Sequence, residues 1–382
     1  MKRHKHALWG IVLLCVAITL GACRPDKKKQ QGSATAIPDT TLDIRYASGF
    51  WLEAKEGYRL LHIKDPQKTN AAEYTFALRE RGTRPILPKG VTVIDLPIQR
   101  FICMTSLQLS SFIRLGATEK VVGISSTRFL ANEAMNRQLK EGTTRKIGIE
   151  GNFDPEIILS LSPEVILISP FKQGGYDAMK EVGIPLLPHL GYKETTPLGQ
   201  AEWIKLTGLL IGEAEKAIGI FKQIEKKYNQ LKSLTAHVTE RPVVLSGEIH
   251  GGSWYAVGGK SFLAEIFKDA GADYVFKDDP RSGGIYLDFE TVYNQADKPQ
   301  YWRILNNYPG MYTYEVLKAQ DARYADFRAF REKGVIYCNM REKAYYENMP
   351  MEPDLLLADF IKVFHPELLP DYEPVYYHLL KE

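Results

Sequence analysis

The feature that most constrains the fold is a long helical pattern in the middle of the chain, from Thr196 to Thr235. Beyond Gly212, apolar residues recur every three or four positions and the positions between them are mostly charged, as in an amphipathic helix with one buried stripe. Gly208 and Gly212 interrupt the earlier part, so the pattern predicts two consecutive helices. The second, with about 20 residues, would be roughly 30 Å long and would cross a small domain. An ordinary long surface helix is the alternative.

The segments on either side of this pattern share one layout. Residues 152–169 and residues 287–304 each contain an acidic helix start, a short amphipathic helix, a proline-marked turn and an apolar strand. Two half-domains of like design joined by a long helix predict two lobes with a cleft, which suits ligand capture better than catalysis. The predicted boundaries are 99–195 for the first lobe, 196–235 for the linking helices and 236–382 for the second lobe.

The N-terminus has the layout of a secretory signal. Three basic residues precede an apolar run of about 14 residues, too short to span a bilayer comfortably. The run ends in Leu-Gly-Ala-Cys23, which resembles the bacterial lipobox, in which the cysteine is diacylated and becomes the first mature residue. We therefore predict a signal peptide over 1–22, a tether over 23–41 and a protein lipid-anchored on the periplasmic or extracellular side of the cell membrane. A signal peptide with an incidental cysteine is the alternative.

Charge and cysteine content narrow the function classes. The chain has 49 Lys and Arg against 46 Asp and Glu, and the predicted signal removes three basic residues and no acidic one. The remaining 46 basic and 46 acidic residues balance, which argues against a nucleic-acid partner. Outside the signal and the lipobox, Cys103 and Cys338 remain, and we expect two buried thiols rather than a disulfide.

Residues 42–98 are predicted to be an N-terminal β extension. Residues 58–64 and 73–80 flank a polar turn region and predict a hairpin, which we expect to add strands to the edge of the first lobe.

The first lobe alternates apolar strands with helices from Arg100 onward, which predicts a mostly parallel, helix-covered sheet. The ends of such strands and the loops after them form the ligand crevice. The predicted rim consists of residues 104–106, 125–128, 171–173 and 189–192.

Several phrases resemble one family, the substrate-binding lipoproteins of ABC importers, in the branch for siderophores, haem and cobalamin. They are FIRLGATEKVVGI (112–124), PEIILSLSPEVILI (155–168), EVGIP (181–185), GGKSFLAEIFKDAGA (258–272) and DLLLADFIKVFHPEL (354–368). The resemblance covers roughly residues 100–369 and implies an α/β fold of two lobes joined by a single long helix. It also implies an ABC permease as partner, a transported ligand instead of an intrinsic cofactor, and a monomer.

The resemblance also implies one surface glutamate per lobe that docks on the permease. Glu265 stands where the second-lobe glutamate belongs. In the first lobe no acid stands at the matching place near Gln173, and Glu181 is the nearest candidate.

Aromatic and basic residues concentrate where the second-lobe cleft is expected. Trp254 and Tyr255 lie in one glycine-rich stretch, and Arg281 and Tyr286 lie in another. Such loops suit a large planar or anionic ligand, by ring stacking and by guanidinium contacts. Trp254 in the core is the alternative, while Tyr301 and Trp302 are predicted to be core residues. The candidates that would face the ligand from the first lobe are Arg128, Lys172 and Tyr192.

Three other motifs give weaker evidence of function. Gly258-Gly-Lys-Ser261 lacks the first glycine of a P-loop, because position 254 is Trp, and Ser261 is expected to cap a helix instead. Ser169 and Lys172 match the spacing of acyl-transfer enzymes, but the partner motifs are missing. His189 and His250 could face each other across the cleft as metal or haem ligands, although two polar rim residues are favoured.

The sequence therefore predicts a binding protein that captures a ferric siderophore, haem or cobalamin and delivers it to an ABC permease. We expect no catalytic residues and no bound metal of its own. The alternatives are an exported cleft enzyme, such as a metal chelatase or hydrolase, and a divalent-metal-ion binding protein.

Overall fold

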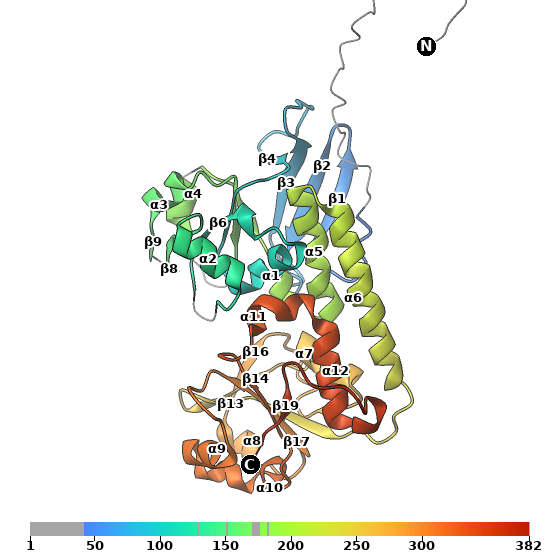
Figure 1. The fold of residues 1–382 in the computed structure, drawn as a ribbon. Helices are drawn as coiled ribbons and strands as arrows, with labels where there is room; N and C mark the ends of the chain where they lie inside the picture. Colours follow the sequence, from blue (N-terminus) through green and yellow to red (C-terminus); the bar gives the residue numbers. More distant parts are fainter. Residues whose placement is uncertain (1–41, 128–129, 150–151, 170–175, 182, 382) are drawn as a thin grey trace, which may run out of the picture. The chain divides into compact units, whose positions relative to one another are not determined.

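The structure, a computed structural model, describes residues 42–127, 130–149, 152–169, 176–181 and 183–381 (Figure 1). The predicted signal peptide, the tether and Cys23 lie outside the described residues, as do Arg128 and Lys172.

The first lobe is built on a five-stranded parallel sheet with the strand order β11-β10-β5-β6-β7. β10 (Val165–Ile168) is buried along its whole length, as expected for a parallel strand covered on both faces. The helix before it begins at Asp154, whose carboxylate accepts a hydrogen bond from Ile157 N at 3.0 Å. The other elements of this lobe are β5 (Phe101–Cys103), α1 (Ser106–Leu115), β6 (Val121–Ile124), α2 (Glu133–Glu141), β7 (Arg145–Lys146), β8 (Gly148–Ile149), β9 (Asn152–Phe153), α3 (Pro155–Ser160), α4 (Asp177–Glu181) and β11 (Leu186–Pro188).

The second lobe contains a five-stranded sheet of order β15-β12-β17-β18-β19, parallel except for β19. Trp302 and Ile304 of β17 are fully buried, which confirms the predicted core role of Trp302, while Tyr301 is partly buried. The elements are β12 (Val243–Ser246), α7 (Phe262–Asp269), β15 (Asp273–Tyr274), α8 (Phe289–Tyr293), β17 (Tyr301–Asn306), α9 (Tyr314–Gln320), α10 (Arg328–Arg331), β18 (Val335–Asn339), α12 (Pro353–Phe364) and β19 (His378–Leu379). The short helix α11 (Tyr345–Asn348) follows β18 in sequence but packs on α1 of the first lobe.

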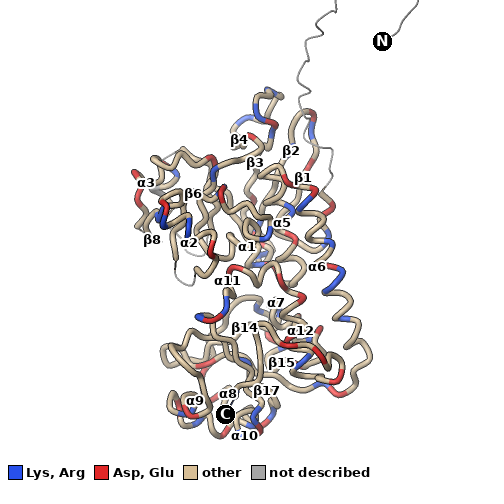
Figure 2. The backbone as a smooth tube through the Cα atoms, in the orientation of Figure 1, with Lys and Arg blue, Asp and Glu red and all other residues tan. Residues whose placement is uncertain are grey.

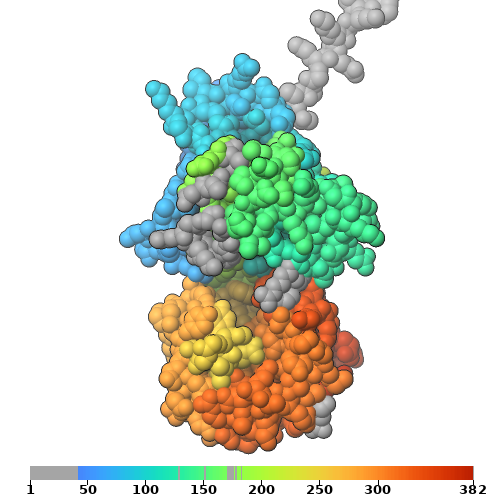
Figure 3. All heavy atoms as spheres, turned by 90° about the vertical axis from the view of Figure 1, so that its left-hand side faces the viewer, coloured from blue at the N-terminus to red at the C-terminus, as the bar shows by residue number. Residues whose placement is uncertain are grey.

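A small antiparallel sheet, β13-β14-β16, stands beside the large sheet of the second lobe. Its strands are β13 (Glu248–His250), β14 (Ser253–Val257) and β16 (Gly284–Leu287). The sequence analysis predicted glycine-rich loops here, and that prediction is wrong for β14 and β16. Gly251 and Gly252 form the turn between β13 and β14, whereas Gly284 is the first residue of β16. Figure 3 shows the hairpin of β13 and β14, in yellow, at the molecular surface.

The N-terminal extension forms its own four-stranded sheet, β1-β2-β3-β4. The predicted hairpin, β2 (Tyr58–Lys64) with β3 (Glu73–Glu80), is confirmed. The prediction that it extends the edge of the first-lobe sheet is wrong, because its strands pair only with one another among the described residues. It packs instead on the linking helices, with the Phe50 and Trp203 rings 4.8 Å apart. The remaining strands are β1 (Phe50–Lys55) and β4 (Thr92–Leu96).

The linking segment contains two helices, as predicted: α5 (Pro197–Ile211) and α6 (Ala214–Leu234). Gly212 separates them because its φ of 82° is left-handed, which only glycine adopts without strain. Figure 1 shows the two helices side by side, and Figure 2 shows charged residues along α6. The buried stripe of α6 consists of Ala217, Phe221, Ile224 and Tyr228.

The C-terminal segment is fixed by one buried carboxylate. Asp359 of α12 accepts hydrogen bonds from the backbone N–H groups of Val375 (2.8 Å), Tyr376 (2.7 Å) and Tyr377 (2.9 Å). This anchoring places the Tyr377 side chain against β17, where it becomes part of the candidate site.

Candidate ligand-binding site

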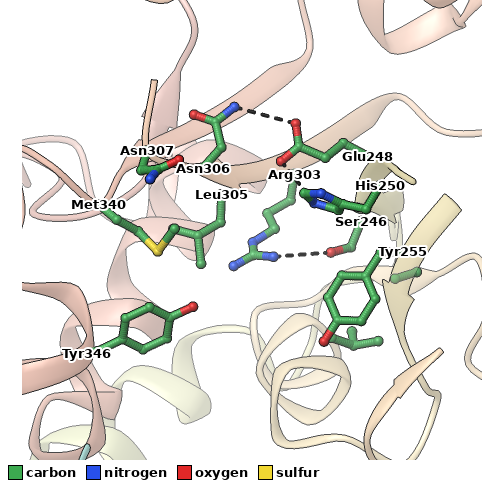
Figure 4. Close-up of a pocket in the computed structure, with 13 residues that line it drawn as sticks. Ser246, Glu248, His250, Tyr255, Arg303, Leu305, Asn306, Asn307, Met340 and Tyr346 are labelled. Atoms are coloured by element: carbon green, nitrogen blue, oxygen red, sulfur yellow. Dashed lines mark hydrogen bonds and ion pairs between the residues drawn. The ribbon is translucent and has the colours of Figure 1, made fainter. Parts of the chain in front are cut away.

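A pocket of about 330 Å³ lies at the carboxyl ends of the parallel strands of the second lobe (Figure 4). Ser246 ends β12, Asn306 ends β17 and Met340 directly follows β18, and all three line it. Ligands of open α/β sheets bind at this edge. The small antiparallel sheet supplies the facing wall, with Glu248, His250 and Tyr255.

The turn that carries this wall depends on one glycine. Gly247 joins β12 to β13 with a φ of 110°, and a Cβ there would lie 2.1 Å from the carbonyl oxygen of Tyr255. A larger residue would therefore push β14 away from β12 and open the pocket wall.

Arg303, in the middle of β17, places a buried guanidinium in the pocket, as Figure 4 shows. The side chain is only 8% exposed. Its Nε donates to the hydroxyl of Tyr377 at 2.9 Å, and its Nη1 reaches Ser246 Oγ at 3.5 Å. Within the described residues, no carboxylate oxygen lies within 4.0 Å of it. The guanidinium is thus held by neutral hydroxyls and keeps its charge uncompensated at close range.

Glu248 is the buried carboxylate of the same pocket. Its Oε1 lies 3.6 Å from Nε2 of His250, and its Oε2 accepts a long hydrogen bond of 3.4 Å from Asn306. Burial raises the pKa of Glu248 above its ordinary value, although His250, Asn306 and Arg303 act in the opposite direction. The pocket therefore contains one fixed positive charge and one carboxyl group that burial favours in its neutral form.

Strand alternation separates the two aromatic residues that the sequence analysis placed together. Trp254 is fully buried among Phe289, Trp302 and Phe327, and its indole N–H donates to the carbonyl of Ser246 at 3.0 Å. The prediction of Trp254 as a ligand contact is wrong, and the alternative, a core tryptophan, is correct. Tyr255, on the opposite face of β14, lines the pocket.

The candidates on β16 and in the loop before it, Tyr286 and Arg281, are not among the residues that line the pocket. The Tyr286 ring lies 5.1 Å from that of Tyr255 and is 65% exposed. Arg281 lies outside the lining, and its side chain donates three hydrogen bonds to Asp279: Nε to Oδ1 at 2.9 Å, Nε to Oδ2 at 3.2 Å and Nη2 to Oδ2 at 2.5 Å. The charge of Arg281 is neutralised by this ion pair with Asp279. Arg303, and not Arg281, is therefore the arginine that lines the pocket.

The first-lobe candidates lie elsewhere or outside the described residues. Tyr192 lines a small separate cavity together with His189 and Trp203. His189 is buried there and packs against Trp203, with ring centroids 4.7 Å apart and the ring planes tilted by 51°, so it does not meet His250 in one pocket. In the described part of the chain, no group of three His, Cys, Asp or Glu side chains is arranged to hold a metal ion.

The predicted docking glutamates are both on helices. Glu265 lies in the first turn of α7, whose N-cap Ser261 accepts a hydrogen bond from Ala264 N at 3.2 Å, as predicted. Glu265 pairs with Lys268 at 3.1 Å. Glu181 is exposed at the end of α4. The geometry leaves both glutamates partly or fully accessible, and their role stays a prediction.

Two further predictions concern cysteine and glycine. Cys103 and Cys338 are buried free thiols, which confirms the absence of a bridge between them. In Gly258-Gly-Lys-Ser261, a Cβ on Gly258 would lie 2.0 Å from the carbonyl oxygen of Arg281, so this glycine serves close backbone packing.

Sequence reasoning missed Arg303 and Glu248. The available signal for Arg303 was a charged residue inside the apolar strand Tyr-Trp-Arg-Ile-Leu (301–305), because charge inside a buried strand needs a partner. The signal for Trp254 was the alternation in Ser-Trp-Tyr-Ala-Val (253–257), typical of a strand with one buried face.

Comparisons with known proteins agree with this geometry. The family model described as "Periplasmic binding protein" matches residues 102–341. Two uncharacterized lipoproteins of Methanocaldococcus jannaschii are similar: one is 27% identical over 98% of this chain and 99% of its own, the other 23% identical over 72% and 67%. No helix among the described residues is long and apolar enough to cross a membrane.

Solved structures show the same fold at low identity. A periplasmic haem-binding protein from Pseudomonas aeruginosa aligns with a TM-score of 0.56 and 17% identity, covering 75% of this chain and 99% of its own. The molybdate-binding protein MolA of Haemophilus influenzae aligns with a TM-score of 0.58 and 18% identity, covering 73% and 90%. The match over residues 102–341 shows that this chain belongs to the periplasmic binding protein family, and the family and the similar solved structures are substrate-binding proteins, not enzymes.

Proposed function

We propose that this protein captures an anionic iron complex, a ferric siderophore or haem, in the second-lobe pocket and delivers it to an ABC permease. Cobalamin, the third ligand that the sequence left open, becomes the least favoured.

The observation that carries this proposal is the buried guanidinium of Arg303. A buried charge costs free energy unless an opposite charge or strong hydrogen bonds compensate it. Arg303 has only neutral hydroxyl partners at close range within the described residues, and it lines an accessible pocket. A carboxylate or catecholate oxygen of the ligand would supply the missing negative charge, and a guanidinium binds such groups with two parallel hydrogen bonds.

The rest of the lining supports a large ligand with an apolar body. Tyr255, Tyr346, Leu305 and Met340 surround the guanidinium (Figure 4). Tyrosine rings and a methionine side chain offer stacking and adaptable apolar contact. The volume of about 330 Å³ is at the small end for ligand sites, so the pocket would hold the anionic part of a larger complex.

Delivery requires a membrane partner and an anchor. We propose that Glu265 and Glu181 dock on the permease and that Cys23 carries the lipid. The lipoprotein names of the M. jannaschii relatives support the anchor.

A small oxyanion such as molybdate is a second candidate ligand. The modest pocket volume favours it, as does the presence of a guanidinium next to the hydroxyl of Ser246. The divalent-metal alternative lacks a ligand cluster in the described residues.

The test is a titration of the full-length protein in detergent with haemin, a ferric tricatecholate siderophore, cyanocobalamin and molybdate. We expect one anionic probe to bind, and Arg303→Gln to weaken its binding about a hundredfold, since a hydrogen bond to a charged group contributes roughly 1.5–3 kcal/mol.

Arg281→Gln is the matched control, because it removes the same charge from a solvent-exposed ion pair outside the pocket. It should leave affinity unchanged. Equal affinity of wild type and Arg303→Gln, or tight binding of cyanocobalamin alone, would refute the proposal, provided that circular dichroism shows both variants folded.

A further inference from the structure

We infer that Glu248 determines specificity by proton-coupled capture: the pocket takes an anionic group together with one proton, which comes from solvent and is held on the Glu248 carboxyl. This inference rests on the proposed function and adds to it a selection for charge and a dependence on pH.

The geometry around Glu248 is unlike that of a structural buried carboxylate. The side chain is about nine-tenths buried, yet the contacts of its carboxylate within the described residues are long: 3.4 Å to Asn306 Nδ2 and 3.6 Å to His250 Nε2. An ionised carboxylate can accept about four hydrogen bonds. Within the described residues Glu248 is therefore poorly stabilised as an anion, and its unused acceptor capacity faces the pocket it lines.

Its neighbours in the lining are mainly hydrogen-bond donors. Arg303, Ser246, Asn307 and Tyr346 can all donate to an anion, as can the amide of Asn306. Glu248 is the one carboxylate that the described residues place in this lining. An anionic group bound to Arg303 would be repelled by an ionised Glu248 in the same lining, because screening is weak in a partly dry site.

A proton on Glu248 removes that repulsion and converts the carboxylate into one more donor. A neutral carboxylic acid in an apolar site is a recognised hydrogen-bond donor to developing anions. Burial already raises the pKa of Glu248, so this carboxyl group takes up a proton at a higher pH than an exposed glutamate does.

Most of the other titratable groups around Glu248 keep a constant charge between pH 6 and pH 8. Arg303 stays positive at any pH of interest. Three phenols interact with Glu248 electrostatically: burial raises the pKa of Tyr324 to about 12 and that of Tyr312 and Tyr337 above the ordinary value, so all three stay neutral. Tyr255 and Tyr346 also line the pocket, and burial raises the pKa of Tyr346 above its ordinary value. The experiment must separate the His250 imidazole from Glu248.

The experiment is calorimetric titration of the full-length protein with the anionic probe that binds best among the ferric tricatecholate, haemin and molybdate. Each titration is run between pH 6 and pH 8 in two buffers with different ionisation enthalpies. We expect the wild type to take up a proton on binding and to bind more tightly as pH falls, by up to about tenfold per unit. Glu248→Gln, a mimic of the protonated acid, should abolish proton uptake and bind about tenfold more tightly than wild type at pH 8.

Two variants make the outcomes distinct. His250→Gln should retain the proton uptake; if it abolishes the uptake while Glu248→Gln retains it, the proton belongs to His250 and the inference is wrong. If Arg303→Gln loses binding but wild type takes up no proton, the proposed function stands and only this inference fails. If no anionic probe binds wild type, the proposed function fails and this inference fails with it.

Discussion

Two of the regions that bury carboxylates in this protein hold them in opposite ways. In the first region, which we call the carboxylate clamp, Glu194 and Glu202 bind the backbone of residues 45–49. Glu202 accepts from Tyr46 N at 2.7 Å, from Ala47 N at 2.8 Å and from Lys205 Nζ at 2.6 Å. In the pocket, Glu248 has contacts no shorter than 3.4 Å and Arg303 has no close carboxylate among the described residues.

This difference distinguishes a buried charge that stabilises the fold from one that is available to bind a ligand. The clamp saturates its carboxylates with donors, so nothing is left for a ligand, and it ties the N-terminal sheet to α5. In the pocket, Arg303 and Glu248 line an accessible volume, and their hydrogen-bonding capacity is only partly used. Buried charge therefore indicates a ligand only where its partners are incomplete.

The largest expected effect comes from breaking the clamp. Glu202→Gln should lower the free energy of unfolding by about 3–5 kcal/mol, because it leaves the Lys205 ammonium buried without its counter-charge. The measurement is urea denaturation followed by circular dichroism. Ligand affinity of the folded fraction should stay that of wild type, and a variant of full stability would show that the clamp is dispensable.

The next effect concerns His189, which is buried beside the clamp. Burial lowers the pKa of His189 from 6.5 to about 4, so the unfolded chain binds a proton in this range that the folded protein does not. Stability should therefore fall as pH drops from about 6.5 toward 4, by ~3 kcal/mol in total. Urea midpoints measured at pH 7.5, 6, 5 and 4 would show it.

His189→Leu should remove this part of the pH slope, since its ring packs on Trp203 and its Nε2 has no hydrogen-bond partner among the described residues. His250→Leu is the control, because His250 is half exposed in the pocket and its loss should leave the slope in place. Identical slopes in wild type and His189→Leu would contradict the burial argument.

The smallest effect on stability is expected at the surface. Glu265→Gln removes one charge of the ion pair with Lys268 on an accessible helix. The free energy of unfolding should therefore change by less than about 0.5 kcal/mol. Ligand affinity should not change either. Uptake of the bound ligand by cells or permease-containing vesicles should fall, because charge at a docking surface governs association. Unchanged uptake would remove Glu265 from the docking surface.

Much of the fold follows from local patterns in the sequence. Gly212 ends α5 because its left-handed φ suits glycine, Ser261 caps α7 through a hydrogen bond to a residue three positions on, and the 58–80 hairpin follows from alternation. Each of these signals involves residues close in sequence, so a single chain segment determines it. The family resemblance added the family assignment, which the match over residues 102–341 confirms.

The site was less accessible to prediction. The composition of the glycine-rich stretches identified Tyr255 correctly. It also assigned Trp254 to the pocket, because composition does not show that neighbouring residues of a strand point to opposite faces. Arg281 was assigned to the pocket because composition does not show its local ion pair. The predicted roles of Arg128, Lys172 and Cys23 lie outside the described residues and stay predictions.

The sequence predicted the mixed α/β class with parallel sheets, the paired linking helices, the strands of the first lobe and the buried thiols. Which cation serves the pocket follows only from the three-dimensional arrangement of the strands. Arg303 meets Tyr377, 74 residues away, and Ser246, 57 residues away. These contacts depend on the register of β12 against β17 and on the anchoring of the C-terminal segment by Asp359. Register and long-range anchoring are set by the packing of whole elements, so no local sequence signal specifies them.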